Sequence, residues 1–196
     1  MRDGNYRRNL PHLFPEGAAI LLTGNLQGSL SMGFVLATRK TAGLFARIDA
    51  NMDTAATGPA WLRRTEIAER VCKAIELGAE ARLCHYTLHE YVVMPNHVHL
   101  LFTPRVEIAQ IMKGLKGTTA RFANLALGRT GKPFWQAESY DQWCRNPADL
   151  EQIRGYILRN PVNAGLASEI GEWPWSRAHR RPPEMRAAAS EQRLTV

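Results

Sequence analysis

The chain has 196 residues, of which 45% are hydrophobic and 22% charged, and this composition is that of one globular domain with additions. It has no apolar run of the roughly 18 residues that span a bilayer and no secretory signal in its first ten residues, so we expect a cytoplasmic protein. Its three cysteines form no CxxC pair, so we expect neither a disulfide framework nor a thiolate zinc site. The net charge of +7 favours a polyanionic partner, above all nucleic acid.

The first half of the chain predicts an arm, a strand and a helix. Residues 1–17 are rich in Pro, Gly and Arg and predict a basic N-terminal arm. The short run AAILLTGNL, residues 18–26, is typical of a strand. Residues 65–78 have apolar side chains at helical spacing between a Thr cap and a Gly stop, so they predict a helix.

Two strands and an amphipathic helix are expected next. Residues 81–96 and 97–102 are rich in strand-forming side chains, and Pro95 with Asn96 predicts the turn of a hairpin between them. Residues 106–128 carry apolar side chains at steps of three and four, the pattern of a helix with one buried face.

A fourth strand and a last helix complete the predicted order. The aromatic-rich residues 132–145 are expected to contain the strand. Asn146 and Pro147 form a helix start, and Pro161 predicts that this helix ends near Asn160, because proline disfavours helical geometry in the residue before it.

The element order is β-α-β-β-α-β followed by one more helix. This order predicts an α+β protein with a ferredoxin-like antiparallel sheet and an added C-terminal helix. We expect the domain to span residues 18–168, and residues 169–196 to form a basic, flexible tail.

Two histidines lie one residue apart in the second hairpin strand, within the stretch YVVMPNHVHLLF. Side chains at i and i+2 of a strand point to the same face, so His97 and His99 project together while Val98 and Leu100 point to the other side. Two adjacent imidazoles suit a shared divalent cation, and burying both unpaired would be costly. A cation needs further ligands from elsewhere in the chain.

The last helix offers candidates for the rest of the site. Tyr156 and Asn160 are four residues apart and therefore lie on one helix face. With Leu150, Ile153 and Ile157 as the core stripe, both sit on its flank. Asn160 can offer a carbonyl oxygen and Tyr156 a phenolic nucleophile, although a flank Tyr often only packs and Asn before Pro is often only a helix stop.

These motifs together resemble a known family. The stretch MPNHVHLL resembles the HUH motif of single-tyrosine transposases, and YILRNPVNAGL resembles the segment that carries their tyrosine. The segments YRRNLPHLFPEGAAILLTGNLQGSL and PFWQAESYDQWCR resemble the REP-associated tyrosine transposases in particular. The resemblance runs in order from about Tyr6 to Leu166.

The resemblance implies a site and a reaction. His97, His99 and Asn160 would bind a divalent metal ion, Mg²⁺ or Mn²⁺, and Tyr156 would attack a phosphodiester of single-stranded DNA beside a hairpin. The product would be a phosphotyrosine and a free 3′-OH, and a second strand end would accept the linkage without ATP. The family includes dimers whose tyrosine acts on the partner subunit, so both a homodimer and a monomer stay open.

Other residues are candidates for DNA contacts or for a different site. Basic and aromatic side chains at several positions can grip phosphates or stack on bases, although they can equally form a solvated face or a core: Arg7, Arg8, Lys113, Lys116, Arg121 and Trp135. His89 is a candidate for a hydrogen bond that supports a metal ligand, or for an alternative ligand.

Two other functions stay open at this point. The first is a domesticated protein that binds hairpin DNA without turnover. The second is an unrelated metal-dependent hydrolase that uses His97, His99 and His89.

Overall fold

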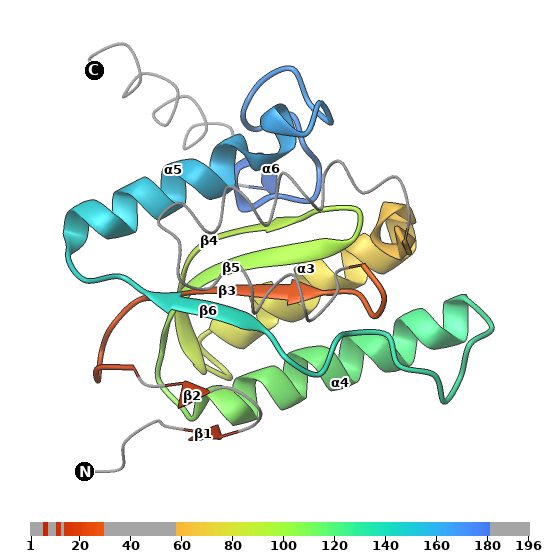
Figure 1. Ribbon diagram of the computed structural model, residues 1–196, viewed down its shortest axis with the longest axis horizontal. Coiled ribbons are helices and arrows are strands. Elements are labelled where there is room, and N and C mark those ends of the chain that lie inside the picture. The colour runs from red at the N-terminus through yellow and green to blue at the C-terminus, as the bar shows by residue number, and fades with distance from the viewer. Residues whose placement is uncertain (1–5, 8–10, 13, 30–57, 181–196) are drawn as a thin grey trace.

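The computed structural model describes residues 6–7, 11–12, 14–29 and 58–180. Its helices and strands follow one another along the chain (Figure 1): β1 (Tyr6–Arg7), β2 (Pro11–His12), β3 (Ile20–Asn25), the 3₁₀ turn η1 (Trp61–Arg63), α3 (Thr65–Ala79), β4 (Tyr86–Val93), β5 (His97–Pro104), α4 (Ile108–Ala126), β6 (Tyr140–Trp143), α5 (Pro147–Asn163) and α6 (Arg177–Arg180). Within this part of the chain, none of the helices combines the length and apolar character needed to cross a membrane.

Four strands form one antiparallel sheet in the order β4-β5-β3-β6, while β1 and β2 pair separately. Two of the helices, α3 and α4, join strands across this sheet, so the chain order β3-α3-β4-β5-α4-β6 is the split-βαβ pattern. The predicted ferredoxin-like sheet with an added C-terminal helix is therefore confirmed.

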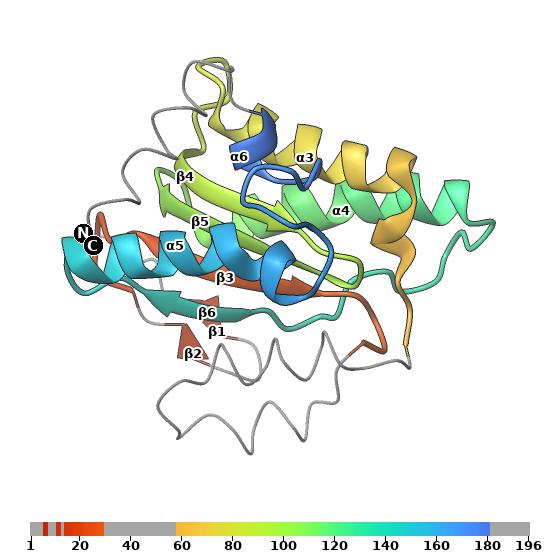
Figure 2. The same ribbon diagram turned by 90° about the horizontal axis from the view of Figure 1, so that it is seen from above.

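Helices cover both faces of the sheet, α3 and α4 on one side and α5 on the other (Figure 2). The faces follow from the alternation of side chains along each strand. In β5, Leu100 packs with the helices α3 and α4, whereas Leu101 packs with Ile153 and Ile157 of α5. Each face of the sheet therefore has its own core, and we call the second one the α5 face.

A bulge in β4 changes which side chains reach the α5 face. The register between β4 and β5 shifts between Leu88 and Glu90, and His89 is the extra residue. Leu88 and Tyr91 are three positions apart, so regular alternation would place them on opposite faces. Because of the bulge, both pack in the core under α3 and α4. The shift turns Glu90 toward the α5 face, where it is fully buried.

The last long helix continues past its expected end. Asn146 caps α5 by accepting a hydrogen bond from the backbone N–H of Asp149 at 2.8 Å, as the sequence predicts. The expected end near Asn160 is wrong, because α5 includes Pro161 and ends at Asn163. Proline in the last turn removes only one backbone hydrogen bond, and burial of Pro161 compensates for that loss.

The chain after α5 lies against the edge of the sheet. Trp173 Nε1 donates to the carbonyl of Val93 at 2.9 Å, and the Val93 N–H donates to the carbonyl of Trp175 at 2.8 Å. Arg180 forms ion pairs at 2.8 Å with both Glu69 and Glu76 of α3. The first part of the expected tail therefore covers β4, while residues 181–196 lie outside the described residues.

Candidate active site

The two histidines of β5 lie on the α5 face and are both fully buried. Their ring centroids are 4.7 Å apart, and His97 Nε2 lies 3.1 Å from His99 Nε2. The strand begins at His97 because the tight turn at Pro95 and Asn96 returns the chain, with the Met94 N–H bonded to the His97 carbonyl at 2.9 Å. The hairpin thus places both imidazoles side by side at one end of the sheet.

Hydrogen bonds orient both rings. His97 Nδ1 lies 2.7 Å from Asn96 Oδ1, which can only accept, so Nδ1 carries the proton and Nε2 carries the lone pair. His99 Nδ1 lies 2.8 Å from Thr23 Oγ1 of β3. A hydroxyl can donate or accept, so Thr23 supports either tautomer of His99. When His99 donates to Thr23, both Nε2 atoms present lone pairs.

The paired Nε2 atoms fit a divalent cation. Two nitrogens 3.1 Å apart are close enough to share one metal ion at bond lengths of about 2.1 Å. Within the described ranges, no group of three or more His, Cys, Asp or Glu side chains is arranged to hold a metal. Among the described side chains, amide oxygens are therefore candidates for a further ligand.

Tyr156 of α5 meets the histidine pair. Its ring centroid lies 5.7 Å from that of His99, and the two rings meet edge to face at 66°. Asn160 follows one turn later on the same helix and is 2% exposed. The structure thus brings His97, His99 and Tyr156 together within one chain and buries Asn160 on the helix that carries the tyrosine.

Apolar and ionic contacts hold α5 in this position. Ile153 and Ile157 are buried against the α5 face, as the predicted core stripe requires. On β4, Glu90 Oε2 lies 3.7 Å from Arg154 Nε. This buried carboxylate therefore attracts the helix two residues before Tyr156.

His89 lies apart from the pair. Its Nε2 lies 2.8 Å from Thr103 Oγ1, and Thr103 is four residues beyond His99, about 13 Å along the strand. Burial, together with the positive charges of Arg177 and Arg154, lowers the pKa of His89. The geometry therefore gives no support to a three-histidine site.

A groove of about 530 Å³ runs between α4 and the segment that leads to β6. Three lysines, Lys113, Lys116 and Lys132, line it together with the ring of Trp135. Its lining contains no acidic residue among those described. Such a groove combines positive charge with an aromatic surface, the pairing that suits unpaired nucleotides.

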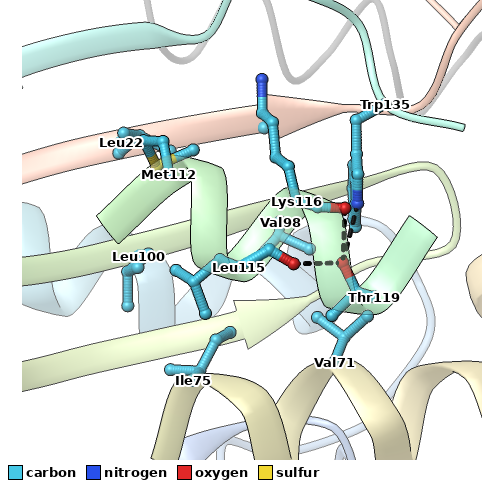
Figure 3. Close-up of a pocket in the computed structure, with 11 residues that line it drawn as sticks. Leu22, Val71, Ile75, Val98, Leu100, Met112, Leu115, Lys116, Thr119 and Trp135 are labelled. Atoms are coloured by element: carbon cyan, nitrogen blue, oxygen red, sulfur yellow. Dashed lines mark hydrogen bonds between the residues drawn. The ribbon is translucent and has the colours of Figure 1, made fainter. Parts of the chain in front are cut away.

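Hydrogen bonds fix the wall of this groove. Lys116 Nζ donates to the carbonyl of Gln136 at 2.8 Å, and Trp135 Nε1 donates to Thr119 Oγ1 at 2.9 Å. Beneath them lies an apolar hollow of about 40 Å³, from which the Lys116 side chain points away (Figure 3). Lys116 therefore positions the segment around Trp135 in addition to adding charge.

The structure describes the side chain of one other predicted DNA contact, Arg121. Arg121 is exposed on α4 but does not line the groove. Arg7 belongs to β1, and Arg8 lies outside the described residues. Of the predicted set, Lys113, Lys116 and Trp135 share one surface, in the part of the chain whose side chains the structure describes.

Sequence reasoning missed Thr23, which bonds directly to His99. The run LLTGN contains a signal for it. Polar residues stand at positions 23 and 25 of an otherwise apolar strand, and a spacing of two residues puts them on the same face. Leu21, on the same face, packs with α5. The period places these polar side chains on one face, but it cannot identify the strand that lies beside them.

Known proteins match this chain in sequence. The sequence model of the family described as "Transposase IS200 like" matches residues 61–160. The REP-associated tyrosine transposase of Escherichia coli (strain K12) is 26% identical over 99 residues, which are 48% of this chain and 56% of that protein. The chain thus matches about half the length of this curated relative.

Solved structures are similar as well. A REP-associated tyrosine transposase bound to a REP hairpin aligns with a TM-score of 0.57 and 21% identity, covering 89% of this chain and 82% of that one. A putative transposase from Deinococcus radiodurans aligns with a TM-score of 0.40 and 17% identity, over 79% and 98% of the two chains. The first likeness supports the fold. With the family match over residues 61–160, it confirms the resemblance that the sequence predicts, and the chain belongs to the IS200-like transposase family.

Proposed function

We propose that this protein is a metal-dependent endonuclease and strand transferase that acts on single-stranded DNA beside a hairpin. The observation that carries the proposal is the edge-to-face contact of Tyr156 with His99, at a centroid distance of 5.7 Å. That contact puts a phenol next to two nitrogens suited to one cation. Family membership and the hairpin bound by a structural neighbour support the same substrate class.

In this proposal His97, His99 and Asn160 hold Mg²⁺ or Mn²⁺. The bound ion would supply charge neutralisation at the scissile phosphate. Asn96 and Thr23 orient the two imidazoles through their Nδ1 atoms, so that both Nε2 atoms face one point. The chain itself therefore contributes a preorganised pair of nitrogen ligands.

Tyr156 is the proposed nucleophile. Its phenolic oxygen forms a bond to phosphorus and loses its proton, while the bond from phosphorus to the 3′ oxygen breaks and that oxygen leaves as a hydroxyl. The fragment downstream of the cut stays attached through its 5′ phosphate, as a phosphotyrosine. A second 3′-OH reverses the step and joins a new strand without an external energy source.

The direct test is formation of the covalent product. The full chain is incubated with a labelled hairpin carrying single-stranded flanks, with Mn²⁺, Mg²⁺ or EDTA, and analysed on a denaturing gel. A labelled band at the mass of protein plus DNA, seen with metal and absent with EDTA, is the expected result. Hairpin affinity without this band under all metals would support the domesticated DNA-binding protein instead.

The groove beside α4 is the proposed path of the single strand. The segment that carries Trp135 is bonded to the site, because the Gln136 N–H donates to the carbonyl of Asn25 at 2.8 Å and Asn25 pairs with His97. A strand that lies along Lys113 and Trp135 therefore leads toward the histidine end of the sheet. The lysines would neutralise its phosphates.

Replacing Lys113 by Ala tests this path. We expect hairpin affinity to fall by roughly three- to tenfold, with the slope of log affinity against log salt reduced by about 0.7, because one phosphate contact is lost. Arg121→Ala is the matched control, since Arg121 is an exposed cation on the same helix outside the groove. Equal losses in the two variants, measured by fluorescence anisotropy, would contradict the path.

A further inference from the structure

Asn25 ends β3 directly opposite His97 in the antiparallel register. Paired residues of antiparallel strands project from the same face, with Cβ atoms about 4.5–5.5 Å apart. The alternation along β3 agrees, because Leu21 packs with α5 and Thr23 bonds to His99. The carboxamide of Asn25 therefore lies beside the His97 ring on the α5 face.

The carboxamide oxygen of Asn25 is buried without a hydrogen-bond donor among the described residues. Asn25 is 3% exposed, and its Oδ1 is inaccessible to solvent. Buried carbonyl oxygens of this kind are uncommon, because an acceptor removed from water loses its hydrogen bonds. This oxygen requires a partner that the protein part of the site does not supply.

Backbone hydrogen bonds on both sides fix the position of Asn25 in the sheet. Its carbonyl accepts a hydrogen bond from the Gln136 N–H at 2.8 Å, and the N–H of the following residue, Leu26, donates to the Asn96 carbonyl at 2.9 Å. These bonds tie the end of β3 to its neighbours on both sides. The end of β3, from which the Asn25 side chain projects, is consequently fixed beside His97.

The histidine that pairs with Asn25 in the register also presents an acceptor. His97 presents a lone pair at Nε2, because its Nδ1 proton is used by Asn96. His99 Nε2 lies 3.1 Å from that atom, and it presents a lone pair as well when His99 Nδ1 donates to Thr23. An amide oxygen beside two imidazole nitrogens is a ligand set that suits a divalent first-row cation such as Mn²⁺. A shared cation satisfies such a group of acceptors together, whereas a further acceptor would not.

We propose that Asn25 Oδ1 is an oxygen ligand of the divalent cation held by His97 and His99. This inference rests on the proposed cation site and adds to it a strand residue besides Asn160 of α5. It makes β3 a part of the site through Asn25 itself and through the bond of Thr23 to His99. Three ligands then come from the sheet, so the cation is held by strands that are paired in register.

The test is Mn²⁺ binding by the purified, metal-stripped full chain without DNA, measured by isothermal titration calorimetry. Asn25→Leu is expected to weaken Mn²⁺ affinity at least about tenfold, and Asn25→Asp is expected to strengthen it, because a carboxylate keeps the oxygen and adds charge. The melting temperature of Asn25→Leu in EDTA is expected to equal or exceed that of the original chain, since the unpaired acceptor is gone.

A purely structural role predicts the opposite pattern, a lower melting temperature in EDTA and unchanged Mn²⁺ affinity. Asn124→Asp is the charge control, because Asn124 is a second buried asparagine but belongs to α4 on the other side of the sheet. It is expected to leave Mn²⁺ affinity within about twofold, since the added charge is distant.

The outcomes separate this inference from the proposed function. Unchanged affinity in both Asn25 variants, with binding lost in His97→Ala, overturns the role of Asn25 and leaves the cation site standing. Absence of Mn²⁺ binding by the original chain overturns both. If Asn25→Leu fails to fold, Asn25→Asp decides alone, and an affinity equal to that of the original chain overturns the inference.

Discussion

Replacing Tyr156 by Phe is expected to abolish the covalent protein–DNA adduct, a loss on the order of a thousandfold or more. The substitution removes the attacking oxygen and keeps the ring. Its edge-to-face contact with His99 and its packing on the α5 face are therefore retained. Hairpin affinity is expected to stay within about twofold, because the ring packing that is retained keeps α5 in place.

Tyr140 provides the matched control. It lies opposite Thr23 in the register of β3 and β6, and Thr23 bonds to His99, so Tyr140 is a tyrosine of the sheet on the histidine face. Tyr140→Phe is expected to leave the adduct intact. Burial raises the pKa of Tyr86 and of Tyr91, and both pack in the core under α3 and α4, so neither competes as a nucleophile. An adduct that persists in Tyr156→Phe and disappears in Tyr140→Phe would assign the chemistry to β6.

Replacing His97 by Ala is expected to remove both Mn²⁺ binding and the metal-dependent adduct, because one of the two converging nitrogens is lost. We expect the loss of Mn²⁺ affinity to exceed about a hundredfold, since substitutions that only disturb ligand orientation already cost about 10- to 100-fold. In the original chain, Mn²⁺ at a hundred times its dissociation constant is expected to add about 2.7 kcal/mol of stability. Thermal unfolding with Mn²⁺ and with EDTA measures that difference, which should vanish in His97→Ala.

Thr23→Val is expected to cause a smaller loss of Mn²⁺ affinity than His97→Ala. Valine has nearly the shape of threonine but cannot bond to His99 Nδ1, so the ring loses its orientation while both nitrogens remain. A 10- to 100-fold loss of Mn²⁺ affinity is expected. The melting temperature of each variant in EDTA reports whether it folds. A folded His97→Ala chain that still forms adduct only when Mn²⁺ is present would remove His97 from the site.

Much of the fold followed from local patterns. The order of elements, the hairpin turn at Pro95 and Asn96, and the buried stripe of Ile153 and Ile157 were all predicted and are observed. The end of α5 was predicted wrongly, because a proline rule describes one residue, whereas burial of Pro161 against the domain is a property of the whole core. In α4, Leu125 lies three residues after Phe122, a step that predicts burial, but it is 73% exposed and Ala123 is buried instead.

The sequence by itself determined which side chains share a face within one element. His97 with His99 and Tyr156 with Asn160 are set by the periods of strand and helix, which depend only on backbone geometry. The tertiary structure alone decided that α5 lies over the histidines, that Lys116 holds the segment around Trp135, and that Thr23 and Asn25 stand beside the pair. Strand register and helix docking depend on the free energy of the whole core. The bulge at His89 is one example, because the period of two along β4 does not predict it.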